Sequence, residues 1–356
     1  MTYQSKPPLP TEFALAIECC RRSVTDPAKV HQLAARTDWH RFLALCERHR
    51  IQGLAWRAVR LLDLAPPAEV ADALAAQAGR IAHQGLLAAS LSDQFLHAFG
   101  KADIPILFLK GLTVSRLAYD DPFVKMSNDL DFLVPLAAVE RAGALLEEAG
   151  FARTLPRRGR LAAWHAGHKE SVWVRDGCPP VELHTRLSDN QRLIPALGNE
   201  SPVQQVAITP DITLPTLARD ELMAYLCVHG ASSAWFRLKW IADFAALLTN
   251  YDSAGLVRLL GRAEQLGAGR AFPVALLLSH RLFGIALGPA TELELGTFTN
   301  RLLAQLAVRE LLDDTEPTQQ PLGTVPIRFF QFLLLPELSF KGSELVRQIK
   351  SSLSRS

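Results

Sequence analysis

The stretch Ser127-Asn128-Asp129-Leu130-Asp131-Phe132-Leu133-Val134 places two aspartates two residues apart at the head of an apolar run. We predict a buried β-strand over 129–134 because the run is short and apolar. Successive side chains of a strand alternate between its faces, so Asp129 and Asp131 should point the same way. Two such carboxylates repel each other and are costly to desolvate unless a hard cation lies between them. The stretch therefore predicts a metal site, although a turn capped by aspartates has the same local pattern.

Two further segments resemble strands on either side of this one. Upstream, the apolar run 105–109 ends in Lys110-Gly111, and a short helix is expected from Gly111 to Tyr119. Downstream, the segments 169–175 and 180–187 flank a turn at Asp176-Gly177-Cys178-Pro179 and predict a hairpin. The second of these segments carries a third carboxylate, Glu182.

The rest of the chain has helical periodicity on both sides of this α/β block. We predict three regions: an N-terminal helical region over 1–100, an α/β core over 101–210 and a C-terminal helical domain over 211–356. The fold class is thus α+β, with a small mixed sheet flanked by helices.

Composition limits the possible partners and compartments. The 356 residues are 49% hydrophobic and 21% charged, which is normal for a globular protein, and the net charge of +2 is too small to indicate bulk nucleic-acid binding. Five cysteines without a Cys-x-x-Cys spacing favour a reducing compartment. The N-terminal segment MTYQSKPPLPTEF has no apolar core typical of a signal peptide, and no stretch is long enough for a membrane span. We therefore expect a cytoplasmic protein.

The three carboxylates are suited to phosphoryl or nucleotidyl transfer. These reactions depend on divalent ions that neutralise phosphates and align the attacking oxygen, and Mg²⁺ prefers carboxylate ligands. We expect Asp129 and Asp131 to bridge two Mg²⁺ ions, with Glu182 binding the ion that activates an acceptor hydroxyl. Glu182 alone is also consistent with an exposed strand carboxylate.

The residues after the first strand are candidates for holding phosphates. Gly111 between a strand and a helix lets backbone N–H groups approach an anion, and the helix N-terminus adds favourable charge. Lys110 and Arg116 are nearby cations, and Thr113 and Ser115 offer hydroxyl donors. Lys110 is equally consistent with a surface lysine at the end of a strand.

The sequence supports a functional role less strongly for three other groups of polar residues. His184 follows Glu182 at period two and shares its face, which makes it a candidate for orienting the acceptor or acting as a general base. Lys239 lies on a predicted helix that could reach a nucleotide phosphate, but its spacing to Asp243 also fits a surface ion pair. The basic run 153–160 is either a solvated loop or a substrate-binding one.

Taken in order, these motifs resemble a known family. Leu109-Lys110-Gly111, Arg116, Asn128-Asp129-Leu130-Asp131 and Glu182-Leu183-His184, followed by His229 and Arg237–Asp243, look like the uncharacterised bacterial nucleotidyltransferases of the polymerase-β superfamily. The resemblance covers roughly residues 10–335. It implies transfer of a nucleoside monophosphate from a nucleoside triphosphate, with ATP expected, to an acceptor hydroxyl, with pyrophosphate leaving.

Two departures from the superfamily pattern leave rival interpretations open. Gly111 is followed by Leu112 where Gly-Ser or Gly-Gly is usual, and Glu182 stands where relatives often carry aspartate. A nucleotide-binding or scaffold protein without turnover is therefore one alternative, and a phosphotransferase that moves the γ-phosphoryl group is another. The acceptor can be a small molecule, a sugar, a peptide or a protein.

Overall fold

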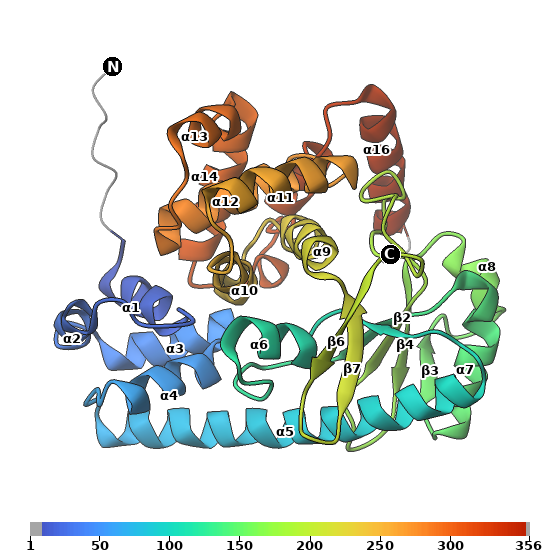
Figure 1. Cartoon of the computed structure of the whole chain (residues 1–356), viewed down its shortest axis with the longest axis horizontal. Coiled ribbons are helices and arrows are strands. Elements are labelled where there is room, and N and C mark those ends of the chain that lie inside the picture. Colours follow the sequence, from blue (N-terminus) through green and yellow to red (C-terminus); the bar gives the residue numbers. More distant parts are fainter. Residues whose placement is uncertain (1–8, 354–356) are drawn as a thin grey trace.

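The N-terminal region is helical, as predicted. The computed structural model describes residues 9–353. Its first helices are α1 (Thr11–Cys19), α2 (Pro27–Ala34), α3 (Trp39–His49), α4 (Gln52–Leu61) and the 34-residue α5 (Ala68–Lys101). Helix α3 begins at Asp38, whose carboxylate accepts hydrogen bonds from the backbone N–H groups of His40 and Arg41. Helix α5 runs along one edge of the molecule, from the helical region to the sheet (Figure 1).

The middle of the chain forms a five-stranded mixed sheet. Its strands are β1 (Leu107–Phe108), β2 (Leu130–Leu133), β3 (Ala152–Leu155), β4 (Glu170–Val174) and β5 (Val181–His184), in the order β1-β2-β5-β4-β3. Only the β2–β5 pair is parallel. The connecting helices are α6 (Leu112–Tyr119), α7 (Val139–Glu148) and α8 (Leu161–His165), with a 3₁₀ turn at Leu136–Ala138. The predicted α+β class, the mixed sheet and the β4–β5 hairpin are confirmed.

One face of this sheet is apolar and packs against helices. Phe132 lies within 5.6 Å, ring centre to ring centre, of Phe95 and 5.5 Å of Phe99 on α5. Trp173 and Leu183 are also fully buried in this cluster, together with residues of α7. Because side chains alternate along a strand, the residues next to Phe132 and Leu183 project from the opposite face. That opposite face carries the polar residues of the candidate site.

A second, two-stranded sheet was not predicted. Strands β6 (Val203–Ala207) and β7 (Thr213–Leu217) pair antiparallel, and β7 packs beside β1. Pro215 lies inside β7, and a proline within a run argues against a strand because it cannot donate to the ladder. The hairpin buries Val206 and Leu214 against the core of the larger sheet.

The C-terminal region is helical from Arg219 onward. Its helices are α9 (Arg219–Ala231), α10 (Leu238–Leu248), α11 (Ser253–Gln265), α12 (Ala271–Phe283), α13 (Pro289–Leu295), α14 (Phe298–Leu312), α15 (Val325–Phe332) and α16 (Leu338–Leu353), with a 3₁₀ turn at Pro317–Gln319. One buried cluster includes residues of α1–α4, α6, α9, α10 and α12. The N- and C-terminal helical regions therefore share a hydrophobic core and enclose α6 between them (Figure 1).

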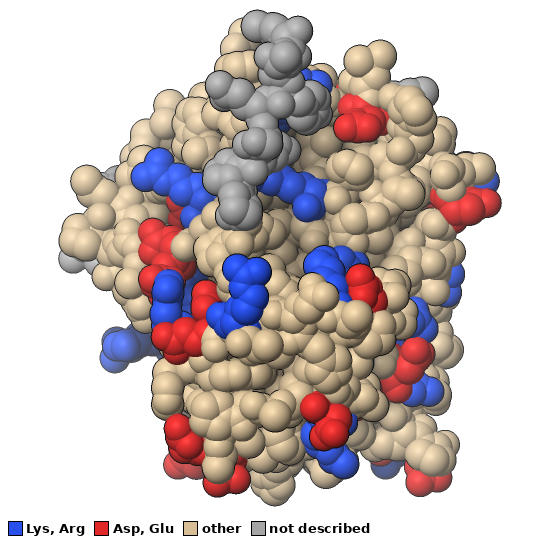
Figure 2. Space-filling model, turned by 90° about the vertical axis from the view of Figure 1, so that its left-hand side faces the viewer, with Lys and Arg blue, Asp and Glu red and all other residues tan. Residues whose placement is uncertain are grey.

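Two observations concern the surface and the termini. The face formed by the N-terminal helices carries lysine, arginine and acidic side chains interspersed with one another (Figure 2). Among residues 9–353, no helix is both long and apolar enough to cross a membrane. The N-terminal segment MTYQSKPPLPTEF was not expected to be a signal peptide. Its first eight residues lie outside the described part of the chain.

Candidate active site

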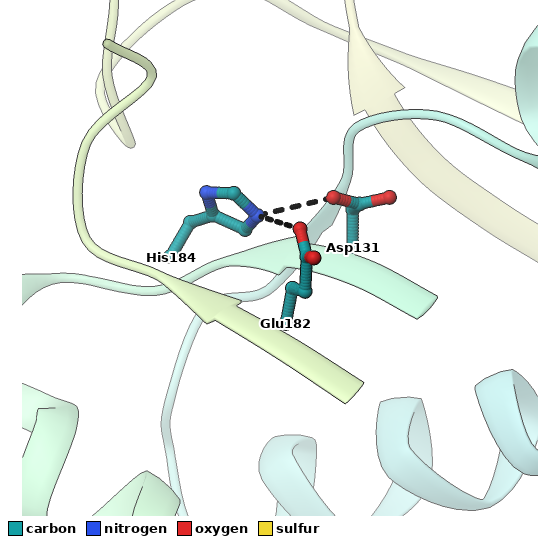
Figure 3. Close-up of side chains that lie close together, drawn as sticks. All are labelled: Asp131, Glu182 and His184. Carbon is teal, nitrogen blue, oxygen red and sulfur yellow. Dashed lines mark hydrogen bonds and ion pairs between the residues drawn. The ribbon is translucent and has the colours of Figure 1, made fainter. Parts of the chain in front are cut away.

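The centre of the site is produced by the register of two parallel strands. In the β2–β5 pair, Asp131 lies directly opposite Glu182, and both project from the polar face of the sheet. His184 lies two residues further along β5, and its Nε2 donates to Asp131 Oδ1 at 3.1 Å and lies 3.5 Å from Glu182 Oε2 (Figure 3). One ligand atom from each of these three residues lies within 4.8 Å of the other two. Strand pairing thus brings together residues more than fifty positions apart in the chain.

A third carboxylate joins this group from the next strand. In the antiparallel β4–β5 pair, Glu170 lies opposite His184, and its Oε2 is 3.6 Å from His184 Nε2. Lys169 forms an ion pair with Glu170. We did not predict Glu170 or Lys169 as site residues. The predicted turn at 176–179 did not fix this pairing, because a shift of one residue in register moves Glu170 to the other face of the sheet.

Asp129 lies just before β2, between the acidic cluster and the neighbouring pocket. Burial, followed by the negative charge of Asp131, raises the pKa of Asp129. Asp129 lines the pocket, whereas Asp131 lies deeper, with only 1% of its side chain exposed. The structure therefore places the two aspartates next to each other, as their spacing predicts, but at different depths.

Burial and charges within the cluster shift the pKa values of its two carboxyl groups in opposite directions. Burial by itself would raise the pKa of Asp131, but the Lys110 ammonium, 2.8 Å from Oδ1, and His184 hold this pKa well below its usual value. Burial raises the pKa of Glu182, and the charges of Asp131 and Glu170 add to the effect. Burial and Lys169 oppose protonation of His184, but hydrogen bonds to Asp131 and Glu182 raise its pKa overall. The cluster therefore favours a charged Asp131 next to a protonated His184.

Gly111 has a backbone conformation that only glycine adopts readily. Its φ of 69° and ψ of −121° lie outside the regions open to other residues. A Cβ atom at this position would also come within 2.8 Å of the Ser127 hydroxyl, which donates to the carbonyl of Asp129. Gly111 thus lets the start of α6 lie against the loop that leads to Asp129, at the edge of the pocket.

The pocket next to the acidic cluster is lined by residues from all three regions of the chain. Its cations are Arg50, Lys110, Lys125, Arg237 and Lys239, and its other polar walls include Asp129, His229 and Asp243. Lys239 therefore faces the same pocket as Lys110 and Gly111, which we expected from the sequence. Arg50 and Lys125 were missed because nothing in their local sequence indicates that they approach residues 110–129.

Three hydroxyl or cationic candidates lie away from this pocket. Thr113 is fully buried, and its hydroxyl donates to the Lys110 carbonyl at 3.3 Å. The Ser115 hydroxyl donates to the Asp121 carbonyl at 2.8 Å. The Arg116 guanidinium donates to the Asp120 carbonyl at the far end of α6 from Gly111. Each of these groups has a backbone carbonyl partner outside the pocket, and contact with phosphate stays a prediction for them.

The structure bears on two alternatives that the sequence left open. Asp243 does not form a surface ion pair with Lys239, since it is buried and bonds both the Lys125 ammonium and the Tyr119 hydroxyl. In the basic run 153–160, Arg157 and Arg158 are exposed, and Arg153 donates to the carbonyl of Gly159. These residues do not line the pocket described here.

Fold and site together define an α+β protein with a carboxylate cluster next to a cation-lined pocket. The chain belongs to a family described as uncharacterised nucleotidyltransferases, which matches residues 35–284, more than half of its length. The match includes the acidic cluster and the pocket cations. No curated protein matches the chain significantly.

Proposed function

We propose that this protein is a magnesium-dependent nucleotidyltransferase of the polymerase-β type. It would transfer a nucleoside monophosphate from a nucleoside triphosphate, most simply ATP, to the hydroxyl group of an acceptor. The observation that carries the proposal is the pairing of Asp131 with Glu182 across parallel strands, beside a pocket lined by Asp129 and several cations. Family membership supports the same class of reaction.

The donor set fits a hard divalent cation. Asp129, Asp131 and Glu182 offer carboxylate oxygens, which Mg²⁺ prefers. The raised pKa values of Asp129 and Glu182 arise from burial together with neighbouring negative charge, a repulsion that a bound cation would relieve. These three residues would hold the metal, whose chemistry is to neutralise phosphate charge and polarise the attacking oxygen.

The chain's own residues then have distinct roles. Lys110 neutralises Asp131 and lies at the pocket edge next to Gly111, whose backbone opens the start of α6 to an anion. His184 holds the carboxylates of Asp131 and Glu182 in place through Nε2, so it is a positioning residue rather than a free base. Glu182, whose side chain is more exposed than that of Asp131, is the better group to accept the proton of the acceptor hydroxyl.

Transfer of label from ATP tests the proposal. The purified protein, Mg²⁺ and an extract that supplies acceptors are incubated with ATP labelled at the α- or the γ-phosphorus. We expect label from the α position in the acceptor and release of pyrophosphate, with none after Asp131→Asn. Asp176→Asn, in the exposed β4–β5 turn, is the matched control. Transfer of γ-label instead would identify a phosphotransferase, and nucleotide binding without any transfer would favour a scaffold.

A further inference from the structure

The five cations of the pocket differ in whether a carboxylate of the protein pairs with them. Lys110 pairs with Asp131, Lys125 with Asp243, and Arg237 forms two hydrogen bonds to Glu316, at 2.9 and 2.7 Å. Within residues 9–353, by contrast, the Arg50 guanidinium and the Lys239 ammonium form no hydrogen bond or ion pair. Both are partly buried and face the same pocket. Partly buried cations without partners are costly, so an anionic ligand would relieve this cost.

Arg50 also occupies a strained backbone position. It ends α3 with φ 57° and ψ 46°, the left-handed conformation that glycine usually supplies at the end of a helix. An arginine there is less favourable than glycine by about 1 kcal/mol. A strained non-glycine residue whose side chain lines a pocket indicates that the side chain is needed there.

The fold fixes Arg50 close to the other pocket residues. Gly53, in the first turn of α4, packs so closely on the carbonyl of Val124 that a Cβ atom would overlap it. This contact joins the N-terminal helices to the segment that carries Lys125 and leads to Asp129. Lys239 lies on the first turn of α10, in the C-terminal helical region.

We infer that Arg50 and Lys239 bind the polyphosphate chain of the nucleotide, with Arg50 supplied by the N-terminal helical region. The inference rests on the proposed function, because that reaction brings a triphosphate next to the carboxylate cluster. A polyphosphate carries several negative charges along a short chain, which suits two cations that line one pocket. A guanidinium also binds phosphate oxygens in a bidentate manner.

Binding of inorganic tripolyphosphate, measured by titration calorimetry without Mg²⁺, tests this inference separately from catalysis. Arg50→Gly and Lys239→Gln should each weaken binding about tenfold or more, the loss expected for one charge-assisted hydrogen bond. Arg50→Gly should leave the melting temperature unchanged or higher, because glycine relieves the left-handed strain. Arg60→Gln, an exposed arginine on α4, is the matched control and should bind like the unmodified protein.

The possible outcomes separate the two proposals. If Arg50→Gly binds tripolyphosphate as tightly as the unmodified protein, the inference is wrong, whether or not the protein transfers nucleotides. If Arg50→Gly and Lys239→Gln lose binding while Arg60→Gln does not, the polyphosphate site stands. In that case, failure of the α-label assay would count against the transfer reaction alone.

Discussion

Lys110 Nζ lies 2.8 Å from Asp131 Oδ1, so a lysine two residues after β1 neutralises the most deeply buried carboxylate of the site. This pairing gives the acidic cluster a built-in counter-charge. A divalent cation bound to the same carboxylates would compete with that ammonium group.

Replacing Lys110 with methionine tests this competition. The free energy of unfolding should fall by about 2–4 kcal/mol, because Asp131 keeps only His184 as a partner. Added Mg²⁺ should raise the melting temperature of Lys110→Met more than that of the unmodified protein, since the metal replaces the lost charge. Lys101→Met, at an exposed site at the end of α5, is the control. Equal Mg²⁺-dependent shifts in all three proteins would show that Lys110 and the metal do not share Asp131.

Asp243 joins α10 to α6 and to the loop before Asp129. It is buried and bonds both the Lys125 ammonium and the Tyr119 hydroxyl. Asp243→Ala leaves the Lys125 charge buried and unpaired, so chemical denaturation should show a loss of about 3–5 kcal/mol. Tyr119→Phe removes only one hydrogen bond and should cost about 1 kcal/mol. Similar losses for the two variants would contradict the expectation that the ion pair with Lys125 contributes more stability than the hydrogen bond from Tyr119.

Gly230 sets the position of α10 through a contact with Trp235. A Cβ atom at 230 would overlap the ring of Trp235, which is fully buried in a turn where its φ is 57°. Gly230→Ala should therefore lower the unfolding free energy by about 3 kcal/mol and weaken tripolyphosphate binding, because α10 carries Lys239. Gly79→Ala, on α5 with open space around it, should instead stabilise the protein by about 0.5–1 kcal/mol. Thermal melts of the two variants that shift in the same direction would refute this account.

The pKa of Lys239 gives the protein a distinctive pH dependence. Burial, then the charges of Lys125 and Arg50, lower this pKa to about 7, against the opposing effect of Asp129 and Asp243. Between pH 10.5, the usual lysine pKa, and about 7, the unfolded chain binds a proton that the folded protein does not. Lys239 therefore destabilises the fold increasingly as the pH falls through this range, and the cost is constant below it.

Lys239→Met should remove this cost. At pH 7 the variant should have a higher free energy of unfolding than the unmodified protein, by about a few kcal/mol for a pKa shift of this size. This difference in unfolding free energy should shrink as the pH approaches about 10. Denaturation curves recorded at roughly pH 6.5, 8 and 9.5 measure this difference in unfolding free energy directly. A difference that does not depend on pH would mean that Lys239 keeps an ordinary pKa.

The local sequence was sufficient for the parts of the fold with strong periodicity. The strand that carries Asp131 and the β4–β5 hairpin follow from short-range patterns and turn residues. The β6–β7 hairpin was missed because Pro215 interrupts the run of its second strand. Its stability comes from packing against β1, which is a tertiary effect.

The site was predictable only in part, for a similar reason. Strand alternation correctly placed Asp131, Glu182 and His184 on one face. Arg116 and Thr113 were chosen for proximity in sequence to Gly111, but helix geometry turns them toward partners along α6. Arg50 reaches the pocket from a region far away in the chain, and only the packed structure shows where its side chain lies.

The uninterrupted course of α5 has a mechanical consequence. Its 34 residues extend about 50 Å as one helix, and its two halves are embedded in different hydrophobic clusters. A rod anchored at both ends resists rotation of the helical region relative to the sheet. We therefore expect substrates to be enclosed through rearrangement of side chains and short loops, with the backbone framework already in its working geometry.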